Sequence, residues 1–230
     1  MKAMLLAAGH GKRLAPLTDH TPKPLLEVNG RPLIDYHLSA LARAGFDDVV
    51  VNVSHLRQQL EDYLADGSRW GLHIDISVEP DDPLETAGGI IKALPLLGSD
   101  PFIVINADTF TMYPFAAPAL PPERLAHLVL VPNPPHNPGG DFCLDGASVQ
   151  NNGPTMHTFA GIGLYAPEFF QVYAADIIEN VQNQPLAPLL RRACSDGKVS
   201  GELFDGVWLD VGTVERLQEA TIAAMQHPSF

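Results

Sequence analysis

The stretch LLAAGHGKRLAPLTDHTPKPLL, residues 5–26, passes from a short apolar segment straight into a loop rich in glycine, proline and basic residues. The apolar segment extends back to the N-terminus, and Met1 to Ala7 is predicted to form a buried strand. Spacing excludes two common nucleotide-binding motifs. A Walker motif needs Ser or Thr where Arg13 stands, and the dinucleotide fingerprint needs a third glycine where Leu14 stands.

The loop has the composition of a phosphate-binding segment. A strand that ends in Ala8-Gly9-His10-Gly11 presents backbone N–H groups that a ligand can approach without side chains in the way. Arg13 then offers a planar fork for phosphate oxygens, and Lys23 a mobile point charge. The loop is therefore interpreted as a cradle for a triphosphate, with a tight turn that carries solvated basic residues as the alternative.

The composition narrows the class of protein. The chain has 230 residues, of which 46% are hydrophobic, and a formal net charge of -13. These values are typical of a globular protein and argue against nucleic-acid binding. Cys143 and Cys194 form no paired motif and are predicted to be buried structural thiols. No segment approaches the ~20 apolar residues of a membrane span, so we expect a cytoplasmic protein without membrane or nucleic-acid partners.

Apolar periodicity and turn residues predict an alternation of strands and helices. The predicted helices are Arg31 to Gly45, His55 to Ala65, Thr86 to Leu97 and Thr213 to Gln226; the predicted strands are Asp48 to Val53, Leu72 to Val78, Phe102 to Asn106 and Ala126 to Val131. Uniformly apolar strands that alternate with helices indicate a parallel sheet covered on both faces.

The second half of the chain has a different pattern. Eight prolines lie between Pro114 and Pro138, too many for regular packing. Asp145-Gly146 and Asp205-Gly206 lie between apolar stretches and are hairpin signals. This half is therefore predicted to be an insertion on one α/β sheet and not an independent domain.

Two aspartates follow predicted strand ends. Asp108 comes after FIVINA, and Asp210 comes after VWL. Carboxylates at the carboxyl ends of sheet strands point into the crevice where α/β proteins bind ligands. Together with phosphate oxygens and water they suit Mg²⁺, which keeps few protein ligands. The alternative is that each is an ordinary turn or helix-capping aspartate.

Several motifs follow one another over nearly the whole chain. They are Leu6-Ala7-Ala8-Gly9-x-Gly11-x-Arg13, Pro16-Leu17-Thr18, Pro22-Lys23-Pro24-Leu25, Leu84-Glu85-Thr86-Ala87-Gly88-Gly89, Asn106-Ala107-Asp108 and Trp208-Leu209-Asp210-Val211-Gly212-Thr213. In this combination the chain resembles the sugar-1-phosphate nucleotidyltransferases. The resemblance implies an α/β, Rossmann-like three-layer fold with a mainly parallel sheet and a β-rich sugar-binding insertion. It implies one domain, residues 1–230, in which 1–113 bind nucleotide and 114–230 form the sugar-binding part and a C-terminal helix.

The resemblance also implies roles for individual residues. Arg13 and Lys23 would be catalytic, Mg²⁺ the cofactor, and Asp108 and Asp210 its ligands. The implied nucleotide-binding residues are Ala7, Ala8, Gly9, Gly11, Arg13, Lys23, Glu79 and Gly88, and the implied sugar-binding residues are Asn106, Asp141 and Gly161. From the residues alone, other interpretations stay open: close helix packing at Gly88, an exposed loop acid at Glu79, and the opening of a hairpin strand at Asp141.

One departure from the family pattern concerns the second phosphate. Hexose-1-phosphate thymidylyltransferases carry a Glu-Lys-Pro segment whose lysine meets the sugar phosphate, and here the region reads Met156-His157-Thr158-Phe159-Ala160-Gly161. This weakens a glucose 1-phosphate interpretation. Arg191, Arg192 and Lys198 are candidate replacements, with a solvated helix face as the alternative.

The resemblance implies that UTP and a sugar 1-phosphate react to a UDP-sugar and pyrophosphate. The short length and Gly140-Asp141-Phe142 favour N-acetylmuramate 1-phosphate as the sugar substrate and a role in peptidoglycan recycling. The alternatives are dTTP with glucose 1-phosphate, CTP with phosphocholine, and an inactive subunit that senses nucleotide or sugar. A monomer is favoured, because the β-helical tail through which longer members assemble is missing, and a small homo-oligomer is the alternative.

Overall fold

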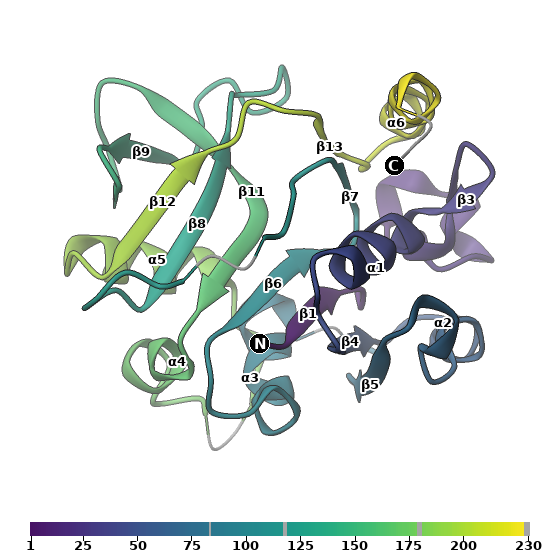
Figure 1. Cartoon of the computed structure of the whole chain (residues 1–230), viewed down its shortest axis with the longest axis horizontal. Helices are drawn as coiled ribbons and strands as arrows, with labels where there is room; N and C mark the ends of the chain where they lie inside the picture. The colour runs from purple at the N-terminus through teal and green to yellow at the C-terminus, as the bar shows by residue number, and fades with distance from the viewer. Residues whose placement is uncertain (83, 117–118, 179–180, 228–230) are drawn as a thin grey trace. The chain divides into compact units, whose positions relative to one another are not determined.

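The computed structural model describes residues 1–82, 84–116, 119–178 and 181–227 (Figure 1). Contacts divide the chain into two compact units, and both are discontinuous in sequence. The loop unit holds the described residues of 2–82, 106–116 and 206–227, and the hairpin unit holds residue 1, 84–105 and the described residues of 119–205. The division of one domain into a nucleotide-binding part, 1–113, and a sugar-binding part, 114–230, stays a prediction.

The loop unit contains a parallel arrangement of strands in the order β5-β4-β1 (Figure 1). Its strands are β1 (Ala3–Leu6), β2 (Glu27–Val28), β3 (Arg31–Pro32), β4 (Asp48–Val53), β5 (His73–Val78), β7 (Thr109–Thr111) and β13 (Trp208–Asp210). Its helices are α1 (Leu33–Arg43), α2 (Arg57–Leu64) and α6 (Val214–Gln226), with 3-10 turns η1 (Lys12–Leu14), η2 (Leu17–Asp19), η3 (Lys23–Leu25) and η4 (Ser68–Trp70).

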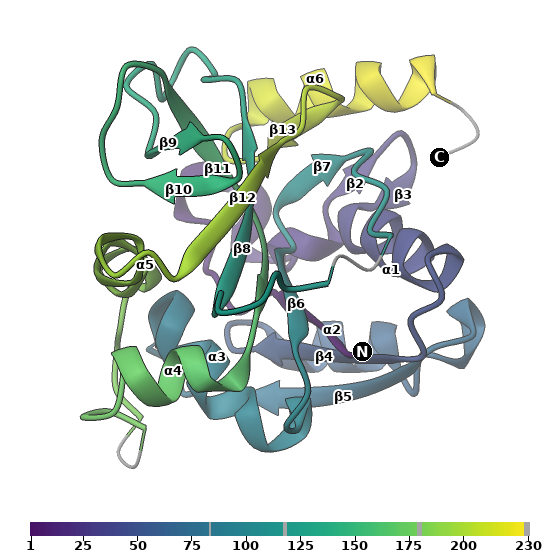
Figure 2. The ribbon, with the colours of Figure 1, turned by 60° about the vertical axis from the view of Figure 1, so that its left-hand side comes forward.

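Apolar burial explains why these segments fold as they do. In β4 the run from Val49 to Val53 is buried throughout, as a strand covered on both faces requires. Helix α6 lies along β2 and β13 (Figure 2) and buries Ala220 and Ala224 against Phe110 and other residues of a shared core cluster. The small alanines let the helix backbone approach the strands closely.

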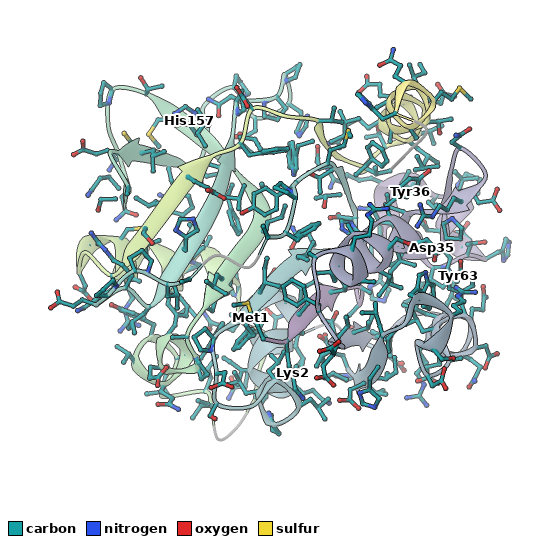
Figure 3. All side chains as sticks on the ribbon, in the orientation of Figure 1. Met1, Lys2, Asp35, Tyr36, Tyr63 and His157 are labelled. Carbon is teal, nitrogen blue, oxygen red and sulfur yellow. The ribbon has the colours of Figure 1, made fainter. Side chains whose placement is uncertain are left out.

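Helices α1 and α2 are joined by a polar contact. The Tyr63 hydroxyl donates a hydrogen bond of 2.9 Å to Asp35 Oδ1, and both side chains lie together in Figure 3. The Arg69 guanidinium stacks on the Tyr63 ring at 3.9 Å from its centroid. The short 3-10 turn that carries Arg69 is therefore held against both helices.

The hairpin unit contains one mixed sheet in the order β6-β11-β8-β12-β10-β9. Its strands are β6 (Phe102–Asn106, whose last residue belongs to the loop unit), β8 (Ala126–Val131), β9 (Phe142–Asp145), β10 (Ser148–Gln150), β11 (Met156–Tyr165) and β12 (Val199–Leu203). Its helices are α3 (Glu85–Leu97), α4 (Pro167–Tyr173) and α5 (Leu186–Ser195). Only β8 and β12 pair in parallel among these six strands; the other described pairs are antiparallel.

Most of the predicted elements are confirmed to within two residues, and β4, β6 and β8 begin and end where predicted. The hairpin at Asp145-Gly146 is confirmed, because β9 and β10 pair across it. The prediction of a hairpin at Asp205-Gly206 is wrong. The strand before it pairs with β8 and β10, and the strand after it pairs with β7, so a local turn signal was overridden by more distant pairing. The sequence did not predict β11, α4 or α5.

Both cysteines are buried and unpaired, as predicted. In the described parts of the chain, no helix has the length and apolar character that a bilayer crossing requires.

Candidate active site

The glycine-rich loop leaves β1 and turns at Gly11. The φ angle of Gly11 is 63°, in the left-handed region, and a Cβ there would lie 2.9 Å from Thr18 Cγ2 and 3.2 Å from Lys23 Cβ. The Thr18 hydroxyl donates to the Gly11 carbonyl over 3.0 Å. Glycine is therefore required at this turn for conformational and steric reasons, and Arg13 is exposed on the short turn that follows.

A buried amide holds the start of the loop. Asn52, 3% exposed in β4, accepts a hydrogen bond of 2.6 Å from the Ala7 backbone N–H. Its Nδ2 donates to Glu79 Oε1 over 2.6 Å. Glu79 is 4% exposed, so its interpretation as an exposed loop acid is wrong. Its predicted contact with a nucleobase stays a prediction. Asn52 was not among the predicted site residues, although a polar residue inside the run VVVNV is a signal of a buried polar contact.

Lys23 and Asp108 form an ion pair. Lys23 Nζ lies 2.5 Å from Asp108 Oδ2, and the exposed fractions of the two side chains are 9% and 37%. Pro22 and Pro24 flank the lysine within a 3-10 turn, which restricts its backbone. The sequence predicted both residues for the site, and the structure places them in direct contact.

Asp210 lies beside Asp108 through backbone pairing. Strand β13 pairs with β7 in antiparallel fashion, with Asp210 opposite Thr109. The Val211 N–H then donates to the Asp108 carbonyl over 2.8 Å. Two aspartates about 100 positions apart in sequence are thus on adjacent backbone segments of one unit.

Arg216, which was not among the predicted site residues, is a further charged residue next to Asp210. Its Nη1 donates to Asp210 Oδ2 in a short ion pair, and its side chain is 13% exposed. A Cβ at Gly212 would lie 2.4 Å from Arg216 Nη2 and 3.1 Å from Arg13 Nη2. The two guanidinium groups therefore approach the same glycine, and any side chain at position 212 would displace them.

His37 supports the same segment from α1. Its Nε2 lies 2.7 Å from the Thr109 carbonyl oxygen, so it donates to this acceptor. The ring is buried, and burial lowers its pKa to about 4, although the Thr109 hydrogen bond and the Asp108 charge oppose the shift. A neutral His37 therefore holds the backbone next to Asp108 at ordinary pH.

These contacts place five charged side chains together in the loop unit. Three are cations, Arg13, Lys23 and Arg216, and two are carboxylates, Asp108 and Asp210, so their summed charge is +1. The whole chain carries -13. A locally positive group in a negative protein attracts a polyanion such as a triphosphate.

The donor chemistry of the two carboxylates suits Mg²⁺. Among the described residues, no three His, Cys, Asp or Glu side chains are placed to hold one ion. A divalent ion at Asp108 and Asp210 would therefore take its other ligands from water and phosphate, which is how Mg²⁺ is usually held. Each carboxylate also contacts a cation of the chain, through its Oδ2 atom.

The remaining predicted site residues lie in different places. In the loop unit, Ala7 and Ala8 are buried, Gly9 is exposed, and the Asn106 carbonyl accepts from Thr109 Oγ1 over 2.9 Å. Gly88, Asp141 and Gly161 belong to the hairpin unit. Their predicted roles stay predictions.

Each of these three residues has a structural role within the hairpin unit. A Cβ at Gly88 would lie 2.4 Å from the Gln182 carbonyl oxygen, so the glycine permits close backbone packing. Gly161 has a φ of 70° within β11, at the register shift of that strand. Asp141 Oδ2 accepts from the Phe159 N–H over 2.9 Å and from Asn137 Nδ2 over 3.2 Å.

The candidates for the second phosphate are also in the hairpin unit. The Arg191 guanidinium lies 5.2 Å from the centre of the Phe142 ring, and Arg192 Nη1 donates to the Tyr173 carbonyl over 3.2 Å. Both side chains therefore have packing roles, and their part in binding the second phosphate stays a prediction.

The fold and the charged loop define a class of nucleotide-transferring proteins. The chain belongs to the nucleotidyl transferase family, whose model matches residues 2–120. It is 51% identical, over 97% of its length and 98% of the relative's, to N-acetylmuramate alpha-1-phosphate uridylyltransferase of Neisseria meningitidis serogroup B. A protein of the same name from Caulobacter vibrioides is 34% identical over 91% of each chain.

Solved structures agree on the fold. A Bacillus anthracis protein assigned as a glucose-1-phosphate thymidylyltransferase, in complex with sucrose, matches with a TM-score of 0.82 and 20% identity over 97% of this chain and 95% of that one. A UDP-glucose pyrophosphorylase complexed with UDP-glucose matches with a TM-score of 0.76 and 18% identity over 98% of each chain. The predicted Rossmann-like α/β fold is confirmed, with a mixed sheet.

Proposed function

We propose that this protein transfers a uridylyl group from UTP to N-acetylmuramate 1-phosphate, giving the UDP-sugar and pyrophosphate. The observation that carries the proposal is the cluster of Arg13, Lys23, Asp108 and Asp210 within one unit. The identity of 51% over nearly the full length of a relative with that activity in its name supports the choice of base and sugar.

The reaction is a direct displacement at phosphorus. An oxygen of the sugar phosphate attacks the α-phosphorus of UTP, a new P–O bond forms, and the bond to the β-phosphate breaks so that pyrophosphate leaves. Such a transfer needs no nucleophile from the protein, so catalysis depends on positioning and on neutralising charge. Backbone N–H groups around Gly9 and Gly11 would orient the β- and γ-phosphates.

The cations of the cluster have distinct tasks in this proposal. The exposed Arg13 would neutralise the pyrophosphate as it leaves, because its planar fork matches phosphate oxygens. Lys23 would neutralise the α-phosphate. Its ammonium group is held by Asp108 and its side chain is 9% exposed, so little side-chain freedom remains to be lost when substrate binds.

Asp108 and Asp210 would hold Mg²⁺. When bound, the ion supplies Lewis-acid neutralisation of phosphate charge. His37 keeps the Asp108 segment in place through the Thr109 carbonyl, and the β7–β13 ladder keeps Asp210 next to it. Asn52 fixes the beginning of the loop through the Ala7 N–H.

The assignment of base and sugar contacts is part of the proposal. Glu79 and Gly88 would read the nucleobase, and Asn106, Asp141 and Gly161 would contact the sugar. The product would serve peptidoglycan recycling in the cytoplasm, where UTP is present, and the protein would act as a monomer. Activity lost on dilution, in step with dissociation seen by light scattering, would contradict the monomer.

A substrate matrix tests the function. UTP, dTTP, CTP and GTP are each combined with N-acetylmuramate, N-acetylglucosamine, glucose and mannose 1-phosphates, and pyrophosphate release is measured with Mg²⁺ present. We expect UTP with N-acetylmuramate 1-phosphate to be the best pair. Preference for dTTP and glucose 1-phosphate would contradict the substrate assignment, and no release with any pair would favour a sensing protein.

A further inference from the structure

Both candidate metal carboxylates carry a cation of the chain itself. Lys23 contacts Asp108, and Arg216 contacts Asp210, in each case at the Oδ2 atom. The two cationic side chains are 9% and 13% exposed, so water screens these pairs less than it screens surface pairs. A free divalent ion would therefore meet carboxylates whose charge is already compensated.

The position of Arg216 in its helix is unusual on electrostatic grounds. It lies in the first turn of α6, after the capping residue Thr213, whose hydroxyl accepts from the Arg216 N–H over 3.3 Å. A cation in the first turn is disfavoured by the helix dipole. Helical side chains lean toward the N-terminus of their helix, which agrees with the contact between the Arg216 guanidinium and Asp210 at the end of β13. The contact with Asp210 offsets the unfavourable position.

Gly212 shows that the arrangement is closely fitted. Its missing side chain leaves room for the guanidinium groups of both Arg216 and Arg13. Lys23 and Arg216 each contact one carboxylate, and Arg13 approaches the same glycine as Arg216. The charges of these five side chains sum to +1, which disfavours the entry of a free dication. A metal–triphosphate complex carries net negative charge and is attracted instead.

We infer that Arg216 is a positioning residue that compensates Asp210 in the absence of nucleotide, so that the divalent ion enters with phosphate and not alone. Arg216 acts through Asp210 and contacts no reacting atom in this account. The inference rests on the proposed use of Asp108 and Asp210 as metal ligands. Metal binding would then depend on phosphate because of the Arg216 side chain.

The test measures Mn²⁺ binding by electron paramagnetic resonance, with and without pyrophosphate. Mn²⁺ prefers the same oxygen ligands as Mg²⁺, and pyrophosphate makes the result independent of base and sugar. The proteins are the wild type, Arg216→Met, Arg216→Lys and, as a matched control on an exposed helix position, Arg57→Met. Thermal unfolding with and without Mn²⁺ is a second readout and verifies that each variant is folded.

We expect the wild type, Arg216→Lys and Arg57→Met to bind free Mn²⁺ weakly and to gain little thermal stability from it. Arg216→Met should bind free Mn²⁺ about tenfold more tightly, because one positive charge has left the site. With pyrophosphate present, Arg216→Met and the wild type should differ by less than about threefold, because phosphate then outweighs the arginine.

Three results would overturn the inference. Equal binding of free Mn²⁺ by the wild type and Arg216→Met would show that Arg216 does not limit metal entry. Weaker binding by Arg216→Met only when pyrophosphate is present would make Arg216 a phosphate ligand. If no protein binds Mn²⁺ even with pyrophosphate, the metal assignment in the proposed function fails as well, and this pattern differs from the other two.

Discussion

Asp108 and Asp210 in the loop unit differ from Asp141 in the hairpin unit in what surrounds the same carboxylate group. The first two contact Lys23 and Arg216, both full cations. Asp141 accepts hydrogen bonds from an amide and a backbone N–H. A carboxylate held by cations can exchange them for another cation, whereas one held by neutral donors fixes the backbone around it.

The network around Asp141 shows this second role. Thr158 Oγ1 donates to Asn133 Oδ1 over 3.0 Å and accepts from Asn137 Nδ2 over 3.1 Å. Asn133 Nδ2 also donates to the Met156 carbonyl over 3.0 Å. The loop of residues 132–138, which contains four prolines, is thus held to β11, in the region where Figure 3 labels His157. Neutral hydrogen bonds shape this surface, while charge dominates the cluster of the loop unit.

The carboxylates held by cations and the carboxylate held by neutral donors should respond differently to substitution around them. Lys23→Met should have the largest effect, a loss of about 10³-fold in kcat, because it removes the charge opposite the α-phosphate. It also leaves Asp108 without its partner, which should lower the free energy of unfolding by about 1–2 kcal/mol. Steady-state kinetics and urea unfolding measure the two effects, and Lys92→Met, exposed in α3, is the control. Near-normal turnover would contradict the role of Lys23.

Arg13→Ala should slow turnover by about 10²–10³-fold through loss of a contact to the leaving pyrophosphate. Because Arg13 is exposed, the free energy of unfolding should change by no more than about 0.5 kcal/mol. The control is Arg57→Ala, another exposed arginine of the same unit. A variant that melts early would show that the arginine is structural.

Asp108→Asn and Asp210→Asn should each lower kcat/KM by about 10²-fold, and the double variant should be barely worse than the worse single one. Extra Mg²⁺ should partly rescue the single variants, since phosphates still supply ligands. The measurement is kcat/KM against Mg²⁺ concentration for all three. Additive losses in log rate without Mg²⁺ dependence would mean that the carboxylates share no ion.

The residues of the glycine-rich loop could be recognised in the sequence for a physical reason, while their role in phosphate binding stays a prediction. Phosphate binding needs glycine and basic residues at fixed short spacings, so Gly9, Gly11, Arg13 and Lys23 were visible as one pattern. The buried strands were equally visible, because a strand covered on both faces is apolar throughout. Local requirements of this kind restrict the residue types at neighbouring positions, so they can be recognised in the sequence.

The sequence could not predict what depends on distant segments. Arg216 has the spacing of an ordinary exposed helix residue, and only the pairing of β13 with β7 and the close approach at Gly212 bring it to Asp210. Asn52 takes its partners from positions 7 and 79. His37 was one histidine on an apolar helix face, and its acceptor is the carbonyl of residue 109.

Asp141→Ala tests the carboxylate that is held by neutral hydrogen-bond donors. It should reduce the free energy of unfolding by about 1–2 kcal/mol, because the Phe159 N–H loses its acceptor. The effect on turnover should stay below about tenfold if the residue mainly shapes the backbone, with a rise in the KM for the sugar phosphate. Asp145→Ala, exposed at the neighbouring turn, is the control. A loss of activity as large as that of Asp108→Asn would remove the contrast between the aspartates.

A substitution of His37 should affect turnover at neutral pH less than the other substitutions do. Its effect should appear in acid, in the way the free energy of unfolding depends on pH. Burial lowers its pKa to about 4 from 6.5, so between these values the unfolded chain binds more protons than the folded one. Stability therefore rises with pH across this window: the contribution is fully present above pH 6.5 and is lost as pH falls toward 4. The size of the loss is on the order of 3 kcal/mol.

The measurement is urea unfolding of the wild type and His37→Gln from pH 4 to 8. Glutamine keeps an N–H that can donate to the Thr109 carbonyl but takes up no proton in this range. The variant should lose less stability than the wild type between pH 6.5 and 4, and both should turn over alike at pH 7.5. Parallel profiles would show that His37 does not titrate with unfolding. A variant that is stable but inactive at pH 7.5 would instead mean that the imidazole, and not only the donor it provides, is needed next to Asp108.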